Sequence, residues 1–147
     1  MTLKALTGEI VLSSVESQEF LQRIISETTK EFPDIEIKTK VLSRTLTADN
    51  ILLSLAIRAG LDVLYDVVKR IVAKLSQRGL SLELNYEARQ LLAKGFLQKN
   101  KVKVVRLVSK TDHPDTSTYV YQSTGGRKHR LVIHSDGACD YTLESRK

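Results

Sequence analysis

The sequence has only one cysteine, Cys139, no tryptophan and two prolines among its 147 residues. A single cysteine excludes an intramolecular disulfide and any zinc site built from several cysteines. The hydrophobic fraction of 41% and the charged fraction of 27% are those of ordinary folded proteins rather than disordered ones. A chain of this length can bury roughly two-thirds of the surface that its unfolded form exposes. We therefore expect a folded protein that needs no disulfide or metal for stability.

Signals for secretion and membrane insertion are also missing. The N-terminal segment has no basic start followed by a long apolar run and a small-residue cleavage site, so we expect a cytoplasmic protein. A membrane-spanning helix needs about 20 mainly apolar residues. The most apolar stretch, residues 50–68, is interrupted by Ser54, Arg58 and Asp62. We expect no membrane span.

Hydrophobic periodicity predicts the elements of the first half. Alternating residues predict a strand just before Ser13, which with Glu16 can form a capping box at the start of a helix. Residues 35–41 alternate clearly and predict a second strand. The apolar stretch from about residue 50 predicts a long helix that ends near Gly79, and residues 80–84 predict another strand. Each crossover is long enough to set two strands parallel, with a helix over the sheet.

The second half begins with a predicted helix and continues with strands. Residues 86–100 carry a helical apolar stripe, and four β-rich segments follow it. Asp136-Gly137 is typical of a type I′ hairpin turn. We predict an α+β protein with a β-α-β-α-β first half (residues 1–85), followed by a helix and a four-stranded antiparallel meander (residues 86–147). The two parts are expected to join in one compact domain.

The predicted long helix raises the question of what covers it. Its polar residues follow one narrow ribbon, which leaves more than half of the circumference apolar. The rest of the chain could bury this surface, or one flank could remain for a partner or a second copy. Gly60 could mark a kink, a close helix crossing or a break. The partner hypothesis makes the chain a non-enzymatic protein-interaction or self-assembly module, with four candidate contact residues: Ile57, Leu61, Leu64 and Val68.

Positive charge is concentrated in the second half. Residues 86–130 contain 10 Lys/Arg and 3 Asp/Glu, whereas residues 1–78 contain 11 and 10. Basic strands that also carry tyrosines are typical of nucleic-acid platforms, although lysines also keep exposed strands from aggregating. No recurring nucleic-acid motif is present. The candidate nucleic-acid-binding residues of this alternative are Lys101, Lys103, Arg106, Tyr119, Tyr121, Arg127, Lys128 and Arg130.

Residues for catalysis are sparse. His129 and His134 lie on opposite faces of one predicted strand, which argues against a shared metal ion. His113 lies in a loop with two aspartates, and His134 could pair with Asp136, so a small hydrolase with His/Asp chemistry is a third alternative. No phosphate-binding loop, dinucleotide fingerprint, zinc-protease pair or serine elbow is present. The sequence therefore implies no cofactor, and we expect Cys139 to be a small core residue.

Overall fold

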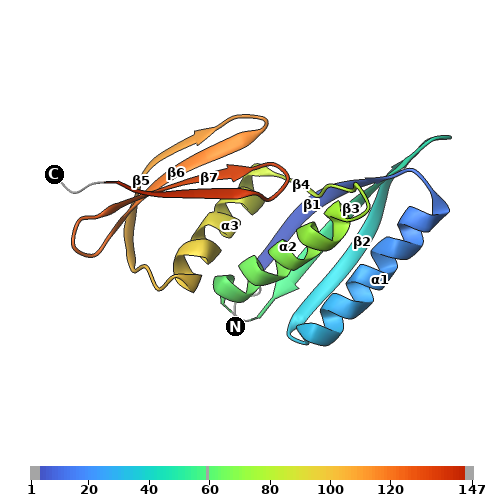
Figure 1. Ribbon diagram of the computed structural model, residues 1–147, viewed down its shortest axis with the longest axis horizontal. Helices are drawn as coiled ribbons and strands as arrows, with labels where there is room; N and C mark the ends of the chain where they lie inside the picture. Colours follow the sequence, from blue (N-terminus) through green and yellow to red (C-terminus); the bar gives the residue numbers. More distant parts are fainter. Residues whose placement is uncertain (1–3, 59, 145–147) are drawn as a thin grey trace.

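The computed structural model describes residues 4–58 and 60–144, which form two four-stranded antiparallel sheets and three helices (Figure 1). The predicted α+β class is confirmed. Sheet A has the strand order β2-β3-β1-β4, with β1 (Lys4–Leu12), β2 (Ile35–Arg44), β3 (Asp49–Ile57) and β4 (Glu83–Leu84). Sheet B has the order β5-β6-β7-β8, with β5 (Val104–Asp112), β6 (Thr116–Ser123), β7 (Lys128–His134) and β8 (Cys139–Glu144). The helices are α1 (Val15–Glu31), α2 (Leu61–Ser76) and α3 (Tyr86–Lys99).

The first part of the predicted long helix is the central strand β3. Its odd-numbered residues from Ile51 to Ile57 are buried, and the residues between them are half-buried. A short run that is apolar on both faces has no period that distinguishes a strand from a helix, so the helical prediction was wrong here. Gly60 marks a break, because it is the extended N-cap residue from which α2 begins.

Strand β3 also changes how the predicted parallel strands are arranged. Both β1 and β2 pair antiparallel with β3, so they run parallel to each other but are not neighbours. Strand β4 pairs antiparallel with the other side of β1. The order β-α-β-β-α-β with this pairing is the split β-α-β, or ferredoxin-like, arrangement.

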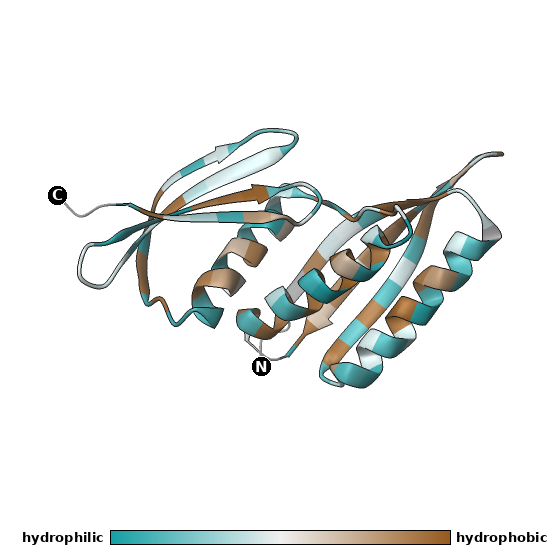
Figure 2. Cartoon of the chain, viewed as in Figure 1, coloured by the Kyte–Doolittle hydropathy of each residue, from teal (hydrophilic) through white to brown (hydrophobic). Residues whose placement is uncertain are grey.

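Helices α1 and α2 lie side by side on one face of sheet A (Figure 1). Helix α1 begins one residue later than the capping-box prediction, because the Ser14 side chain accepts a hydrogen bond from the Ser17 backbone N–H at 3.1 Å. Hydrophobic and hydrophilic residues alternate along β2 (Figure 2), as expected for a strand with one face toward the helices. Among the described residues, no helix combines the length and the apolar composition that crossing a membrane requires.

Helix α3 joins the two sheets. It packs against α2 on one side and beneath sheet B on the other (Figure 1). Gly95 permits a close crossing of the two helices, since a Cβ there would lie against the Leu61 carbonyl and 3.0 Å from the Tyr65 Cβ. One continuous hydrophobic core runs from sheet A through these helices to sheet B.

Sheet B has the predicted meander, but one turn differs in type. Gly137 has φ +93, whereas Asp136 does not have a positive φ, so the turn is not type I′. The Gly137 N–H donates to the His134 carbonyl at 3.0 Å, and the His134 N–H donates to the Ala138 carbonyl at 2.8 Å. These bonds define a three-residue loop in which the glycine occupies the left-handed position of a bulge.

Candidate functional site

The four residues proposed to contact a protein partner are not on the surface. Ile57, Leu61, Leu64 and Val68 all belong to the core of the chain, with exposed fractions between 0% and 7%. Their proposed position in an interface is therefore wrong. Sheet A covers one flank of α2, and α3 covers another. The sequence argument missed this because it assigned α3 to a separate half of the chain.

Sheet B brings several of the predicted basic residues together on its outer face, the face away from α3. Arg106, Gln122 and Lys128 occupy one row across β5, β6 and β7. The Arg106 Nε donates to the Gln122 Oε1 at 2.8 Å. Arg130 lies two residues along β7 from Lys128 and therefore projects from the same face.

The remaining basic candidates lie at the same end of sheet B. The Thr124 N–H, in the turn between β6 and β7, donates to the Lys103 carbonyl at 3.0 Å. This bond brings the segment of Lys101 and Lys103 beside the turn that carries Arg127. We call the whole set the basic end: Lys101, Lys103, Arg106, Arg127, Lys128 and Arg130.

All six side chains of the basic end are exposed. Within the part of the chain that the structure describes, none of the six forms an ion pair with a carboxylate, whereas Lys38, Arg70, Lys74, Lys99 and Lys110 each do. Glu144 on β8 is the cross-strand partner of Lys128, so one carboxylate lies beside the basic end without forming an ion pair there.

The two tyrosines proposed to stack on bases are buried. Tyr119 and Tyr121 do share one face of β6, and their ring centroids lie 6.2 Å apart, but that face packs against α3. Their exposed fractions are 0% and 2%. Burial raises the pKa of Tyr121 to about 12. Base stacking by these residues is ruled out in this structure, because the lysines and arginines of β7 project from the opposite face of the sheet.

A polar cluster on the inner face of sheet B was not predicted; His129 and Ser123 are buried, whereas Tyr141 is 40% exposed. The His129 Nδ1 lies 2.7 Å from the Tyr141 hydroxyl, and its Nε2 lies 2.9 Å from the Ser123 Oγ. Burial, aided by the charge of Arg127, lowers the pKa of His129 and favours the neutral ring. A serine beside a histidine is the arrangement of a nucleophile and its base. Here, however, the third partner is a neutral phenol, which does not stabilise an imidazolium as a carboxylate does. The cluster therefore fits hydrogen bonding between β6, β7 and β8 better than catalysis.

The histidines proposed for catalysis lie apart from one another. The His134 Nε2 is 2.9 Å from the Asp140 Oδ2 rather than near Asp136, whose Oδ1 accepts from the Ala138 N–H at 3.0 Å. His113 is exposed in the loop between β5 and β6. Among residues 4–58 and 60–144, no three His, Cys, Asp or Glu side chains are grouped so that they could hold a metal ion.

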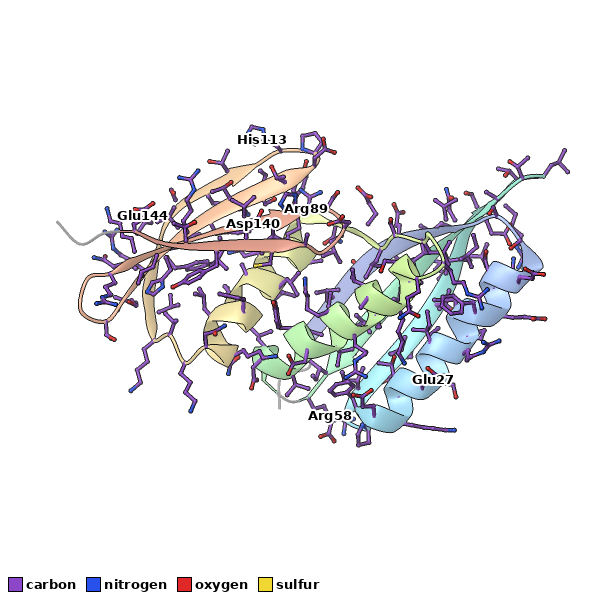
Figure 3. All side chains as sticks on the ribbon, viewed as in Figure 1. Glu27, Arg58, Arg89, His113, Asp140 and Glu144 are labelled. Atoms are coloured by element: carbon purple, nitrogen blue, oxygen red, sulfur yellow. The ribbon has the colours of Figure 1, made fainter. Side chains whose placement is uncertain are left out.

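The other functional group that sequence reasoning missed is a buried arginine. Arg89 is 3% exposed and lies between the start of α3 and the loop that carries His113 (Figure 3). Its guanidinium donates to the carbonyls of Leu84 at 3.1 Å, His113 at 2.8 Å and Pro114 at 2.6 Å. Helical periodicity gave no signal for it, because arginine on a helix is normally exposed.

No protein-family model matches the chain, and a search of curated proteins finds no match. A functional assignment must therefore rest on the geometry of the described residues.

Proposed function

We propose that this chain is a non-enzymatic nucleic-acid-binding module that holds a phosphate backbone against the basic end of sheet B. The observation that supports this proposal is the convergence of six exposed cations, none of which forms an ion pair among the described residues, although Glu144 lies across the strand pair from Lys128. Residues separated by up to 29 positions in sequence contribute to this one surface, from Lys101 to Arg130.

Electrostatics explains why such a surface favours a polyanion. Arg106 and Lys128 lie two strands apart in their row, at about 10 Å, and Lys128 and Arg130 lie about 7 Å apart along β7, so their like charges repel one another. Two like charges about 8 Å apart cost about 0.5 kcal/mol even in bulk water. A phosphate backbone removes this repulsion and releases its own condensed counterions, which supplies most of the free energy of sequence-independent binding.

The mode of binding follows from the side chains at the basic end. Arginine and lysine contact phosphate oxygens, and these contacts position a nucleic acid without reading its sequence. Single strands are commonly held by bases stacked on exposed aromatic rings. The basic end contains no aromatic residue, and Tyr119 and Tyr121 are buried. The backbone of a duplex is therefore the better fit, with little sequence preference.

Reversal of charge at the basic end tests the proposal. We expect R106E/K128E/R130E to bind a short DNA duplex at least about tenfold more weakly than the wild type at low salt. The slope of log K against log [salt] should decrease by about 2 to 3, since each lost phosphate contact contributes about 0.9. Fluorescence anisotropy between about 50 and 200 mM salt measures both quantities.

A matched variant separates the basic end from net charge. R23E/K30E/R58E changes the formal charge by the same amount, at three exposed positions in the other half of the chain. Its binding should remain within about threefold of the wild type, because the screening length is only about 7 to 14 Å at these salt concentrations. Equal weakening in both variants, or no retention of duplex by the wild type at low salt, would contradict the proposal.

We also propose a cytoplasmic location. The support is that the single cysteine, Cys139, is free and half-buried, as a thiol in a reducing compartment would be. Burial raises its pKa to about 11, so the thiol is a poor nucleophile at neutral pH.

A further inference from the structure

The outer face of sheet A is the face opposite α1 and α2. Along one row of this face, the positive and negative side chains lie at opposite edges of the sheet. Lys40, Leu52, Glu9 and Glu83 form one row across β2, β3, β1 and β4. Near the centre of this face, the small side chain of Ser54 lies next to Leu52 on the outward side of β3. The row thus has a lysine at one edge of the sheet and two carboxylates at the other.

The two carboxylates create an electrostatic cost within the chain. Glu9 and Glu83 are direct partners in the antiparallel pair of β1 and β4, where like charges destabilise a sheet. Neither of them has a cation as an ion-pair partner within residues 4–58 and 60–144. Lys40 is two strands from Glu9 and three from Glu83, which corresponds to about 10 and 14 Å. The described part of the chain therefore contains no cation paired with these two carboxylates.

We propose that the outer face of sheet A pairs with the same face of a second copy, with Lys40 of each copy seated against Glu9 and Glu83 of the other. A two-fold axis parallel to the strands sets β2 of one copy over β4 of the other while preserving the register along the strands. Each row of one copy then faces the same row of the other copy in reverse order. The edge with Lys40 therefore meets the edge with Glu83 at two places in the dimer. Such a self-complementary contact closes as a dimer.

A cleft next to the glutamates provides room for the incoming lysine. It has a volume of about 450 Å³, and its lining includes Glu9, Glu83, Tyr86 and Arg89. The Arg89 guanidinium is directed at the carbonyls of Leu84, His113 and Pro114, and it anchors the wall of the cleft rather than neutralising the glutamates. Tyr86 is 44% exposed, so its ring can contact the lysine stem.

Other ways of pairing sheet A fit the charges less well. A two-fold axis in the same plane but perpendicular to the strands would set β2 over β2 and bring the strand that carries Lys38 and Lys40 against the same lysine-bearing strand of the other copy. Pairing through the free edge of β2 is opposed by the lysines and by the register shift between Val41 and Ser43, since edge lysines and bulges both prevent strand addition.

The size of the face sets the strength expected of the dimer. Three strand spacings by six to nine residues correspond to roughly 300 to 450 Å² per copy, which is below the usual 800 Å² per partner of a stable interface. The dimer should therefore dissociate on dilution and weaken as salt rises.

Charge exchange between two variants tests this pairing. Sedimentation equilibrium of the wild type at low salt should show a weight-average mass that rises with concentration from the 16.5 kDa of the monomer toward twice that value. K40E and E83K should each remain monomeric, because each sets like charges against one another across the axis. An equimolar mixture of the two variants should regain the dimer, since the carboxylate introduced at position 40 of one then meets the ammonium introduced at position 83 of the other.

Mixing the two variants also controls for misfolding of either variant and for the change in net charge. Both positions are exposed, and the two substitutions change the formal charge in opposite directions. Wild-type protein that stays monomeric at the highest concentration overturns the proposal. So does a dimer that persists in both single variants, or a mixture that fails to regain it. K40E should still bind duplex DNA as the wild type does, so the failure of this inference can be distinguished from failure of the proposed function.

Discussion

The two sheets have the same strand number and antiparallel pairing but differ in what fills their cores. Sheet A is covered by α1 and α2, and its buried residues are almost all aliphatic. Sheet B is packed on α3, and its interior contains Tyr119, Tyr121 and His129. Of the five buried polar or charged residues in the described chain, Thr28 lies beside sheet A, and Arg89 lies between the sheets, with its Nε donating to the Leu84 carbonyl of β4. The other three, Ser117, Ser123 and His129, belong to sheet B.

This difference follows from how much helix each sheet receives. Two helices provide sheet A with enough apolar surface to complete a core by hydrophobic contact alone. One helix over four strands leaves the ends of sheet B with less cover, and hydrogen bonds between side chains and loop carbonyls tie those ends together. We therefore expect that replacing a buried polar side chain by an apolar one lowers stability around sheet B and has almost no effect around sheet A.

The largest effect is expected for Arg89→Met. This substitution removes the donor of the Leu84 carbonyl and the Ser117 hydroxyl, whose bonds to Arg89 are buried, and of the partly buried carbonyls of His113 and Pro114. The free energy of unfolding should fall by about 2 to 4 kcal/mol. Urea denaturation measures it, with the exposed Arg23→Met on α1 as a control that should change stability by less than about 0.5 kcal/mol. If the two variants were equally stable, the expected importance of buried polar groups around sheet B would be contradicted.

An intermediate effect is expected from the pH dependence of His129. Because its folded pKa is lowered below 6.5, the unfolded chain takes up a proton first as the pH falls. Stability is therefore fully present above about pH 6.5 and decreases as the pH falls toward the folded pKa, by at most about 1.4 kcal/mol per pH unit. Urea denaturation from about pH 8 to pH 5 should show this decrease in the wild type.

His129→Gln isolates that contribution. The variant should be less stable than the wild type near pH 8, because it loses the contacts to Ser123 and Tyr141. The difference between the two proteins should shrink as the pH decreases, since all other titrating groups cancel in the comparison. A difference that stays constant across the range would show that His129 titrates equally in both states.

The smallest effect is expected for Thr28→Val on α1. The Thr28 side chain is fully buried, and its Oγ1 has no hydrogen-bond partner. Valine has a similar shape and removes the unsatisfied hydroxyl, so stability should be unchanged or rise by up to about 1 kcal/mol. Ser117→Ala is the matched change near sheet B, where the Ser117 Oγ accepts from Arg89 at 3.2 Å, and it should be destabilising. If thermal denaturation showed that Thr28→Val is more destabilising than Ser117→Ala, the expected difference between the two sheets would be contradicted.

Periodicity predicted the fold wherever one face of an element is polar. It identified α1, β2, α3 and the meander of sheet B, because each has an alternation or a stripe that only one secondary structure explains. It failed at β3, which is apolar on both faces and is followed by a helix of similar composition. The error then hid the hairpin of β2 and β3, and with it the ferredoxin-like order of sheet A.

The sequence shows which basic residues form the candidate site, but it does not show which side chains share a face of the sheet. The cluster of basic residues is visible in the sequence, and Arg106, Lys128 and Arg130 do share a face. Which face of β6 is buried depends on where α3 packs, so the inward direction of Tyr119 and Tyr121 could not be derived from alternation alone. The same is true of Arg89, whose acceptors come from a loop 24 and 25 residues away.

The close crossing at Gly95 has a mechanical consequence. Because α2 and α3 meet there closely within one continuous hydrophobic core, rotation of one sheet against the other is restricted. Two copies joined through sheet A would therefore carry their cationic surfaces at one fixed separation and angle. A long duplex that matches this spacing would be held by both copies at once, and the second attachment would benefit from a high effective concentration.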